Sequence, residues 1–463
     1  MSLEQVAELA IETMQQAGAD FSDIRIERTH VTELVVENGD VTETKSALLI
    51  GAGLRAFVSG SWAFAQTTDL ARSEIEETGK ATVRIAKMLS EKRESAFELS
   101  AQVNKGSSTH DCKRPFIDVS FEEKISLLQE LNKLARSYGD SIYRSRHAYE
   151  EQKIDVLIMN SWGTAVSLDH SLPYLKAFSY SKKGNTLHRG AKMLGGSGGF
   201  EVISGSRAFE ATQSASELAI DLLSSKPSKG GVQDIIADPD LSGVLAHEAY
   251  GHGCEADNWS AGSTILIDKY QRKIGFEDIT IIDDPTMAGL RGSFRYDWEG
   301  THAKKRVLIK NGIMNELLHS LSTASELGME LNGAARSQSF MFEPIPRMGN
   351  TIIQPGSYSL QEMIGEMQSG LLMCGMGGGY AISDLGQYMF RSTHGYEIKN
   401  GELGDLVHGA SILGQHLNTL EKIDAVGKDI DLFPGTCGKG EQMVPDMSGG
   451  PHLRIRQMNV GGA

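Results

Sequence analysis

Six consecutive residues, His247-Glu-Ala-Tyr-Gly-His252, give the strongest indication of chemistry in this chain of 463 residues. The two imidazole side chains can donate ring nitrogens to a metal ion such as zinc. The carboxylate between them, that of Glu248, can take a proton from a water molecule that the metal activates. This pattern is typical of a metal-dependent hydrolase. The competing interpretation is a solvent-exposed end of a helix that binds no metal.

The spacing of the two histidines predicts a local distortion of the helix. They lie five residues apart, whereas the common zinc-peptidase motif H-E-x-x-H places its histidines four apart on one helical face. Five steps along an ideal α-helix separate two side chains by about 140°. A single wide turn of the π type brings residues five apart nearly into line. Gly251 and Gly253, on either side of His252, make such a turn less costly.

The residues before the motif predict that it lies on a buried helix. Residues 234–239 are typical of a strand that ends in a turn, and residues 241–246 form the apolar beginning of a helix. An unpaired His-Glu-His cluster would be costly in such a place. The metal site is therefore favoured over the exposed helix end.

The residue types alone leave the third metal ligand open, although a catalytic zinc site needs three protein ligands and one open position. Cys254 is expected to point away from the face that His252 uses. Cys437 lies between glycines at 434–440, where it is equally suited to deliver a thiolate to a metal or to fill a buried turn. The full set of candidates is Cys254, Glu255, Asp257, Cys374, His394, His408, His416, Cys437 and His452.

Composition excludes several classes of protein. The net charge of −15 argues against a general nucleic-acid binder, because phosphate neutralisation needs clustered Lys and Arg. The four cysteines are widely spaced and do not form a disulfide framework. Residues 1–10 are typical of an amphipathic helix and not of a signal peptide, and no segment is long and apolar enough to span a bilayer. We therefore expect a cytoplasmic protein with no membrane partner and no direct nucleic-acid partner.

The element pattern predicts an α+β fold with two domains. Residues 1–225 are expected to form an N-terminal α+β domain with an antiparallel sheet, in which helix, paired strands and helix occur twice, at about 1–95 and 115–225. Residues 226–463 are expected to form a β-rich domain that carries the metal-binding helix. We expect residues 97–115 to be irregular and residues 412–424 to be helical.

Two glycine-rich segments do not indicate a nucleotide site. Residues 195–199 and 375–379 lack the Walker lysine and the strand-to-helix setting of a dinucleotide fingerprint. Close approach of two backbones, or an extended peptide lying beside a glycine-rich strand, explains them better.

At this level of detail the chain resembles the TldD branch of the TldD/PmbA family, zinc metallopeptidases once described as modulators of DNA gyrase. The resemblance runs nearly from end to end. A non-catalytic branch of the family lacks the histidine motif, which this chain keeps. The motifs that carry the resemblance are His247–Asp257, Asp297–Gly300, Val307–Gly312, Pro346–Asn350, Cys437–Gln442 and Asn459–Gly462.

The resemblance implies a set of roles for the residues of the motifs. His247, His252 and Cys437 would bind one zinc ion per chain, and Glu248 would be the general base. Cys254 departs from the family pattern, so a competing thiolate near the metal has to be considered. Arg347 and Asn350 would either orient the substrate or cap a turn.

The resemblance also implies partners and a function. We expect a peptidase that acts on small or unstructured peptides, bound as extended strands in the enclosed cavity of a homodimer or of a heterodimer with a non-catalytic paralogue. The first alternative is a peptide-binding or regulatory subunit with a structural metal, active only with a paralogous partner. The second is a modulator that binds DNA or gyrase directly, although the acidity of the chain disfavours DNA binding.

Overall fold

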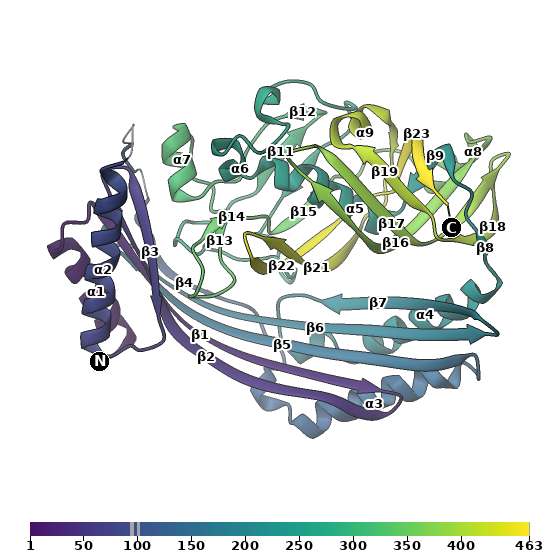
Figure 1. The fold of residues 1–463 in the computed structure, drawn as a ribbon. Coiled ribbons are helices and arrows are strands. Elements are labelled where there is room, and N and C mark those ends of the chain that lie inside the picture. Colours follow the sequence, from purple (N-terminus) through teal and green to yellow (C-terminus); the bar gives the residue numbers. More distant parts are fainter. Residues whose placement is uncertain (93–96, 100–101, 463) are drawn as a thin grey trace.

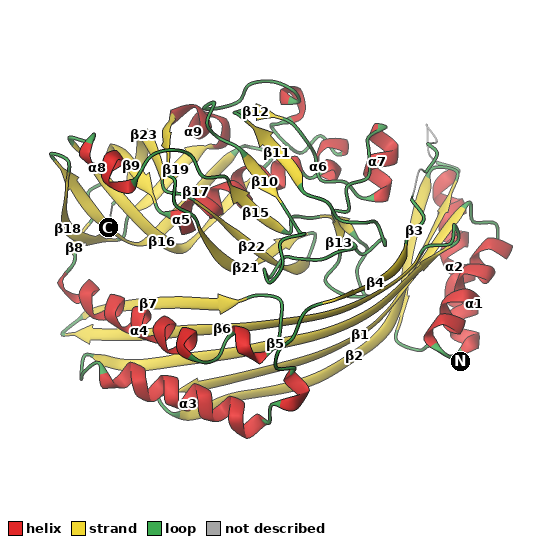
Figure 2. Ribbon diagram, turned by 180° about the vertical axis from the view of Figure 1, so that it is seen from behind, coloured by secondary structure: helices red, strands yellow, loops and turns green. Residues whose placement is uncertain are grey.

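The computed structural model describes residues 1–92, 97–99 and 102–462. A long twisted sheet, built from the first half of the chain, carries helices on one face and the β-rich second half of the chain on the other (Figures 1 and 2). The fold is therefore α+β, as the sequence predicts. In the described part of the chain, no helix is long and apolar enough to cross a membrane.

The first half of the chain repeats the order helix, three strands, helix within one sheet. The strand order is β3-β2-β1-β5-β6, and β7 pairs with β6. The two repeats meet where β1 and β5 run antiparallel, from Asp23 opposite Asn160 to Glu37 opposite Arg146. The elements are α1 (Leu3–Gln16), β1 (Phe21–Glu37), β2 (Asp40–Val58), β3 (Ser61–Thr67), α2 (Arg72–Ser90), α3 (Phe121–Ser137), β5 (Ile142–Asn160), β6 (Ala165–Lys183), β7 (Thr186–Gly195) and α4 (Ser206–Asp221).

The prediction that residues 97–115 are irregular is wrong for one segment, because Lys105–Thr109 forms strand β4 parallel to β6. Its sequence, Lys-Gly-Ser-Ser-Thr, has none of the apolar alternation by which a strand is recognised. Main-chain pairing with β6 holds it in the sheet. Such pairing leaves no trace in the side-chain pattern.

Alternation along the strands divides the sheet into two faces. Ile24 and Ile26 of β1 pack with α1 and α2, and Leu34 and Val36 pack with α3 further along the same face. Arg25 lies between Ile24 and Ile26 and points the other way, where its guanidinium donates to the Ser337 hydroxyl in the second half of the chain. Large buried cations are thus among the contacts that join the two halves of the chain. Arg55 of β2, for example, is 2% exposed and pairs with Asp23 and with Glu299.

The second half of the chain contains a closed ring of strands. The order β16-β9-β23-β19-β17 returns to its start because β17 also pairs with β16. Further short strands and helices extend this ring. The elements are β8 (Lys226–Pro227), β9 (Gly231–Ala237), α8 (Leu360–Gly365), β16 (Ser369–Ile382), β17 (Gln387–Lys399), β18 (Glu402–His408), β19 (Ser411–Gln415), α9 (His416–Lys422), β20 (Ile423–Val426) and β23 (Leu453–Gly461).

The predicted helix over 412–424 is only half right. Ser411–Gln415 forms β19, in which Ile412 pairs with Phe390 on one side and with Val460 on the other. The helix, α9, begins at His416. A short apolar run is too short to show whether its hydrophobic residues follow a helical or a strand period. Here the run is a strand because it pairs with β17 on one side and β23 on the other.

A six-stranded sheet lies beside the ring and completes the architecture (Figure 1). Its strand order is β12-β11-β10-β15-β22-β21, and its last two strands form a hairpin near the C-terminus. The remaining elements are α5 (Pro239–Val244), α6 (Ala256–Ser260), β10 (Ile281–Asp283), β11 (Arg306–Lys310), β12 (Ile313–Met314), α7 (Leu321–Leu327), β13 (Ala335–Arg336), β14 (Ile345–Pro346), β15 (Asn350–Ile353), β21 (Asp431–Lys439) and β22 (Gln442–Gly450).

Candidate metal centre

The helix that carries the His-Glu-His motif begins at a strong N-terminal cap. The Asp238 side chain accepts a hydrogen bond from the Leu241 amide, and Pro239 occupies the first turn, where its missing N–H costs nothing. After α5 the helix widens into a π-helical segment, η4, that spans Leu245–Gly251. The wide turn predicted from the five-residue spacing is confirmed. It places His247 and His252 side by side, with ring centroids 5.2 Å apart.

Gly251 is required in this turn by a close neighbour. A Cβ atom at this position would lie 1.9 Å from the Met348 sulfur, well inside van der Waals contact. Met348 is itself fully buried, so it has no free space into which to retreat. The glycine thus lets the wide turn pack directly against the loop before β15.

Cys437 reaches the same place from the hairpin of β21 and β22. It lies opposite Val444, and Gly435 lies opposite Asp446. Residues directly opposite each other, and residues two apart along a strand, share one face of a sheet. Cys437 and Asp446 therefore both face the helix. Three elements that are distant in sequence meet here.

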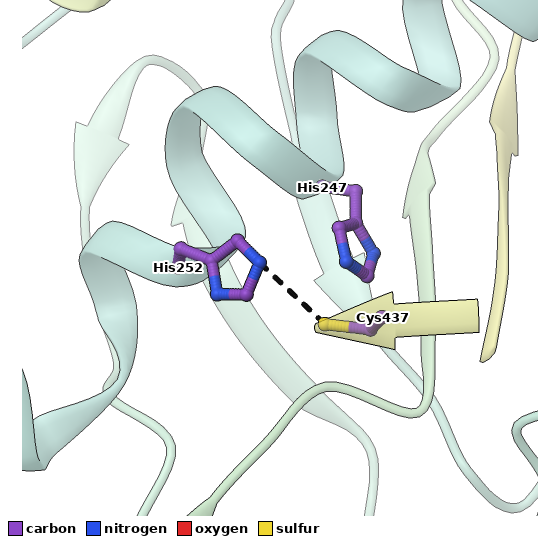
Figure 3. Close-up of side chains that lie close together, drawn as sticks. All are labelled: His247, His252 and Cys437. Carbon is purple, nitrogen blue, oxygen red and sulfur yellow. Dashed lines mark hydrogen bonds between the residues drawn. The ribbon is translucent and has the colours of Figure 1, made fainter. Parts of the chain in front are cut away.

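His247, His252 and Cys437 form a compact cluster of metal-binding atoms (Figure 3). One ligand atom from each residue lies within 4.8 Å of the others, and the Cys437 sulfur is 3.5 Å from His252 Nε2. Ligand atoms around a tetrahedral zinc ion are about 3.3–3.8 Å apart, given typical Zn–N and Zn–S lengths. Two imidazoles and one thiolate are a donor set that suits zinc. The cluster could hold such an ion with small side-chain movements.

A buried carboxylate stands behind each histidine. His252 Nδ1 is 2.9 Å from a Glu255 carboxylate oxygen, and His247 Nδ1 is 3.4 Å from an Asp446 oxygen. Glu255 is held in turn by Lys439 Nζ at 3.1 Å. Carboxylates in this position fix the orientation of a ligating imidazole.

Charge in the cluster is strongly perturbed by mutual contact. Burial raises the pKa of the Cys437 thiol, but His247 and His252 outweigh it and hold that pKa well below its usual range. Burial lowers the pKa of His247, but Cys437 and Asp446 raise it to about 9. Against its own burial, Glu255 and Cys437 raise the pKa of His252 well above its usual value. These contacts favour the thiolate form of Cys437 and the protonated forms of His247 and His252.

Glu248 lies on the accessible side of the cluster. Its side chain is 38% exposed, whereas that of His252 is 12% exposed and that of His247 is 5% exposed. One of its carboxylate oxygens is 3.8 Å from His252 Nε2. The carboxylate can thus reach both the ligand cluster and a molecule that approaches from solvent.

Comparison with known proteins assigns this chain to a family. Three domain models match in succession: PmbA/TldA metallopeptidase domain 1 at residues 22–86, the central domain at 114–223 and the C-terminal domain at 230–462. A protein of Methanothermobacter thermautotrophicus named metalloprotease is 35% identical over 96% of this chain and 96% of its own length. The chain belongs to the TldD/PmbA family.

Other relatives and solved structures extend the comparison. A zinc metalloprotease TldD homolog of Saccharolobus solfataricus is 27% identical over 98% of this chain and 99% of its own length. Two crystal structures share the fold. A Thermotoga maritima protein named as a candidate modulator of a DNA gyrase has a TM-score of 0.80 at 20% identity, covering 99% of this chain and 100% of its own. TldE from Thermococcus kodakarensis has a TM-score of 0.77 at 18% identity, covering the whole of both chains.

The structure of this TldD/PmbA family member separates the two nearby cysteines. Cys254 is fully buried, and its sulfur is 3.8 Å from the Met314 sulfur in the apolar core. Burial raises the pKa of its thiol far above the usual value. Cys254 therefore faces away from the cluster, as its place two residues after His252 predicts.

The other candidates for a third ligand also lie elsewhere. Within residues 1–92, 97–99 and 102–462, the one group of three or more metal-binding side chains is His247, His252 and Cys437. Glu255 supports His252, and Asp257 pairs with Lys439 at 2.6 Å. Four histidine candidates have other partners: His394 is hydrogen-bonded to Thr393, His408 to Ser225 and His452 to Asp429, and the ring of His416 packs against that of Tyr250. Cys374 is paired with His394 across β16 and β17.

Arg347 and Asn350 are buried supports of the loops around the site. Arg347 donates to the main-chain oxygen of Cys437 at 2.6 Å, which anchors the strand that carries the thiolate. Asn350 donates to the Asp284 main-chain oxygen and to the Ser293 hydroxyl. Both residues are fully buried, so contact with a substrate would require that these bonds be broken.

Three residues of the site lacked a recognisable role in the sequence. The sequence predicts Glu255 only as a possible metal ligand, and it gives no individual role to Asp446 or Lys439. Glu255 lies three residues after His252, a spacing that brings side chains together on a helical turn and is the local signal for this pair. Asp446 and Lys439 depend on the register of the hairpin, which the sequence does not reveal.

We predict that Gly251→Ala destabilises the protein and disturbs the cluster, although alanine is the better helix former. The new methyl group overlaps Met348, and overpacking of this kind costs about 1–3 kcal/mol. The matched control is Gly365→Ala in α8, where an added Cβ meets nothing within 4 Å and should stabilise by about 0.5–1 kcal/mol. Thermal unfolding of both variants checks this, and equal effects would contradict the packing argument.

Proposed function

We propose that this chain is a zinc-dependent peptidase of the catalytic branch of its family. One zinc ion per chain is held by His247, His252 and Cys437. The observation that carries the proposal is the convergence of these three ligand atoms beside a half-exposed carboxylate, that of Glu248. The names of the relatives support the same reaction class.

In the proposed mechanism, different residues around the zinc site have different roles. When bound, zinc supplies a Lewis acid that makes water a stronger acid and polarises a carbonyl oxygen. Glu248 takes a proton from the attacking water and returns it to the leaving amine. Glu255 and Asp446 hold the two imidazole rings in orientation, and Arg347 holds the main chain of Cys437.

The substrates that we propose are small or unstructured peptides, bound in extended form in the enclosed cavity of a dimer. Main-chain hydrogen bonding to a strand edge accepts varied side chains. β16 pairs with β9 only over Leu371–Met373, so among the described strands its remaining residues have a partner, β17, on one side alone. Gly378, in this open stretch, has no neighbour within 4 Å of an added Cβ. The partner subunit is a second copy or a non-catalytic paralogue.

The alternative is a peptide-binding subunit whose metal is structural and which acts only with a paralogous partner. This alternative is compatible with the similarity of the fold to that of TldE, because proteins with different names in this family share the same fold. Structural zinc sites fill four positions with protein ligands, whereas catalytic sites leave one open. Among the described residues the cluster has three ligands, which favours the catalytic role.

We predict that Glu248→Gln abolishes hydrolysis while zinc stays bound. The amide keeps the shape of the side chain but cannot accept a proton, and loss of a general base lowers the rate by about 10²–10⁴-fold. The purified chain and the variant, each loaded with zinc, are incubated with a pool of unstructured peptides, and the products are followed by mass spectrometry. Cleavage by the variant at the wild-type rate would remove Glu248 from this role. No cleavage by either would favour the partner-dependent alternative.

The two nearby thiols provide a matched pair of variants. Cys437→Ser should weaken zinc binding by at least about 100-fold. Loss of a group that only hydrogen-bonds to a metal ligand already lowers metal affinity by about 10–100-fold, and loss of a ligand itself should cost no less. Cys254→Ser should leave zinc affinity within a few-fold, and its cost should be in stability, since a hydroxyl replaces a thiol in the apolar core. Zinc titration against a competing chelator measures both. The reverse order would assign the third ligand to Cys254.

The pH dependence of zinc binding follows from the protonation of the cluster. Two imidazolium protons, on His247 with a pKa of about 9 and on His252 with a pKa raised further, must leave before the rings can bind zinc, whereas Cys437 is already a thiolate. The affinity should therefore rise about 100-fold per pH unit between pH 6 and pH 8. Competition titrations at three pH values check this. A slope of one proton or fewer would contradict the charge state that we assign.

A further inference from the structure

A cavity lies between the long twisted sheet and the hairpin of β21 and β22, on the face of the hairpin that points away from the metal cluster. Cys437 and Asp446 face the helix. Their neighbours Thr436 and Pro445, which lie opposite each other, face the sheet instead and line the cavity. Figure 1 shows this hairpin above the middle of the long sheet. None of the three clustered metal-binding side chains is among the described residues that line the cavity, so it is separate from the candidate metal centre.

The cavity has the size of a small organic molecule. Its volume is about 210 Å³, which is below the range of about 300–1,000 Å³ that is typical of pockets for drug-sized ligands. An apolar cavity of about 150 Å³ can hold benzene, and by the same ratio this cavity would hold roughly eight non-hydrogen atoms. Three lining side chains, those of Leu49, Met341 and Met443, are 37%, 40% and 50% exposed and mark its opening to solvent.

Two buried arginines, Arg291 and Arg336, line this cavity without a carboxylate partner. Each guanidinium donates to two main-chain oxygens, and among the described residues neither has a carboxylate oxygen within 4.0 Å. Burial lowers the pKa of both side chains, and Asp446 opposes this from a longer distance. Asp446 is also the group that supports His247. A buried cation without a close counter-charge is costly, so these two arginines indicate that an anion binds here.

Two further side chains of the cavity wall contain polar atoms without a partner. Glu27 Oε2 and His170 Nε2 are buried and form no hydrogen bond, and both residues line the cavity. The other carboxylate oxygen of Glu27 accepts from the Thr29 hydroxyl at 2.6 Å. His170 is held in place by the ring of His110, which stacks on it with centroids 4.2 Å apart. Because buried polar atoms in proteins nearly always have partners, these two atoms indicate that the cavity holds a polar molecule.

Water alone would satisfy only part of this arrangement. Water molecules can hydrogen-bond to Glu27 Oε2, to His170 Nε2 and to Arg336 Nε, which also has no partner. Water carries no net charge, however, so it would leave both guanidinium groups without a counter-charge. A carboxylate supplies that charge and matches the planar donors of a guanidinium group. The arginines therefore favour a ligand with a carboxylate over water.

We propose that this cavity binds a free amino acid. The carboxylate of the ligand would lie at Arg291 and Arg336, and its ammonium group would lie at Glu27. The other acidic residue of the lining, Glu150, is already paired with Lys176. Burial raises the pKa of Glu27, so a bound ammonium group would stabilise the charged form of this side chain. A zwitterion thus supplies a counter-charge to the arginines and to Glu27 at the same time.

The apolar part of the wall favours an aliphatic side chain on the ligand. Ile154, Leu172 and Trp298 are buried and line the cavity beside the charged groups. L-Leucine is close to the size that the volume allows, so it is the ligand that we choose for the tests. The inference rests on the proposed function only for the source of the ligand, because cleavage of small peptides releases free amino acids. Binding itself does not require hydrolysis.

Three ligands of the same shape test the assignment of charges. Calorimetric titration of the protein, with zinc bound and after zinc removal, compares L-leucine with leucinamide, which lacks the carboxylate, and with 4-methylpentanoate, which lacks the ammonium group. L-Leucine should bind at least about tenfold more tightly than either, because hydrogen bonds to charged groups contribute about 1.5–3 kcal/mol. Binding should persist without zinc, because the cavity is separate from the metal centre. No binding of L-leucine, equal binding of leucinamide, or binding that is lost with the zinc would overturn the proposal.

A matched pair of variants tests the place of the ammonium group. Glu27→Gln keeps the shape of the side chain and should weaken L-leucine by about tenfold or more, but it should leave 4-methylpentanoate nearly unaffected. Glu33→Gln is the control, because Glu33 lies on the same strand but pairs with exposed Lys45, and it should leave both affinities unchanged. Equal weakening of both ligands by Glu27→Gln, or an unchanged affinity for L-leucine, would contradict the assigned contact. Neither titration measures hydrolysis, so failure of the peptidase proposal and failure of this one are distinguishable.

Discussion

The buried carboxylate of Glu255 is the group on which the geometry of the candidate metal centre depends. It accepts from His252 at the end of the wide helical turn and from Lys439 on the C-terminal hairpin. Burial raises its pKa, but Lys439 and His252 lower it to about 2, so it remains ionised across the physiological range. An ionised group with no exposure is tolerated only where its partners surround it. Glu255 therefore links the end of this helix to the hairpin.

The same requirement accounts for two fully buried arginines in this half of the chain, Arg347 and Arg306. Arg347 lies 3.9 Å from Glu255 and also bonds to the main chain of Cys437. Arg306 pairs with Asp283, and both are fully buried. A guanidinium group offers five donors in a fixed plane, so one side chain can tie several main-chain oxygens together. Loops and short strands that lack long ladders of their own are fixed in this way.

The sequence predicts those features whose signal is local. The wide turn follows from the five-residue spacing of His247 and His252. Features that depend on distant pairing are not predicted. β4 has no apolar pattern, and β19 is a strand because two neighbours pair with it. From its own residues, Cys437 is equally suited to bind a metal or to fill a buried turn, and only the resemblance to a family favours the metal. Nothing in its local sequence connects Cys437 to His252, which lies 185 positions earlier.

That separation along the chain has a consequence for the order of events in the cell. A ribosome releases the two histidines long before it adds the segment with Cys437, which lies in the last tenth of the chain. Until the C-terminal hairpin has been synthesised and has paired beside β15, the nascent protein has two of its three clustered donors. Under the proposed function, a complete zinc site can form only on a chain that includes this hairpin. A chain truncated before β21 would keep the His-Glu-His motif, yet it would lack Cys437 and Lys439, which complete the cluster.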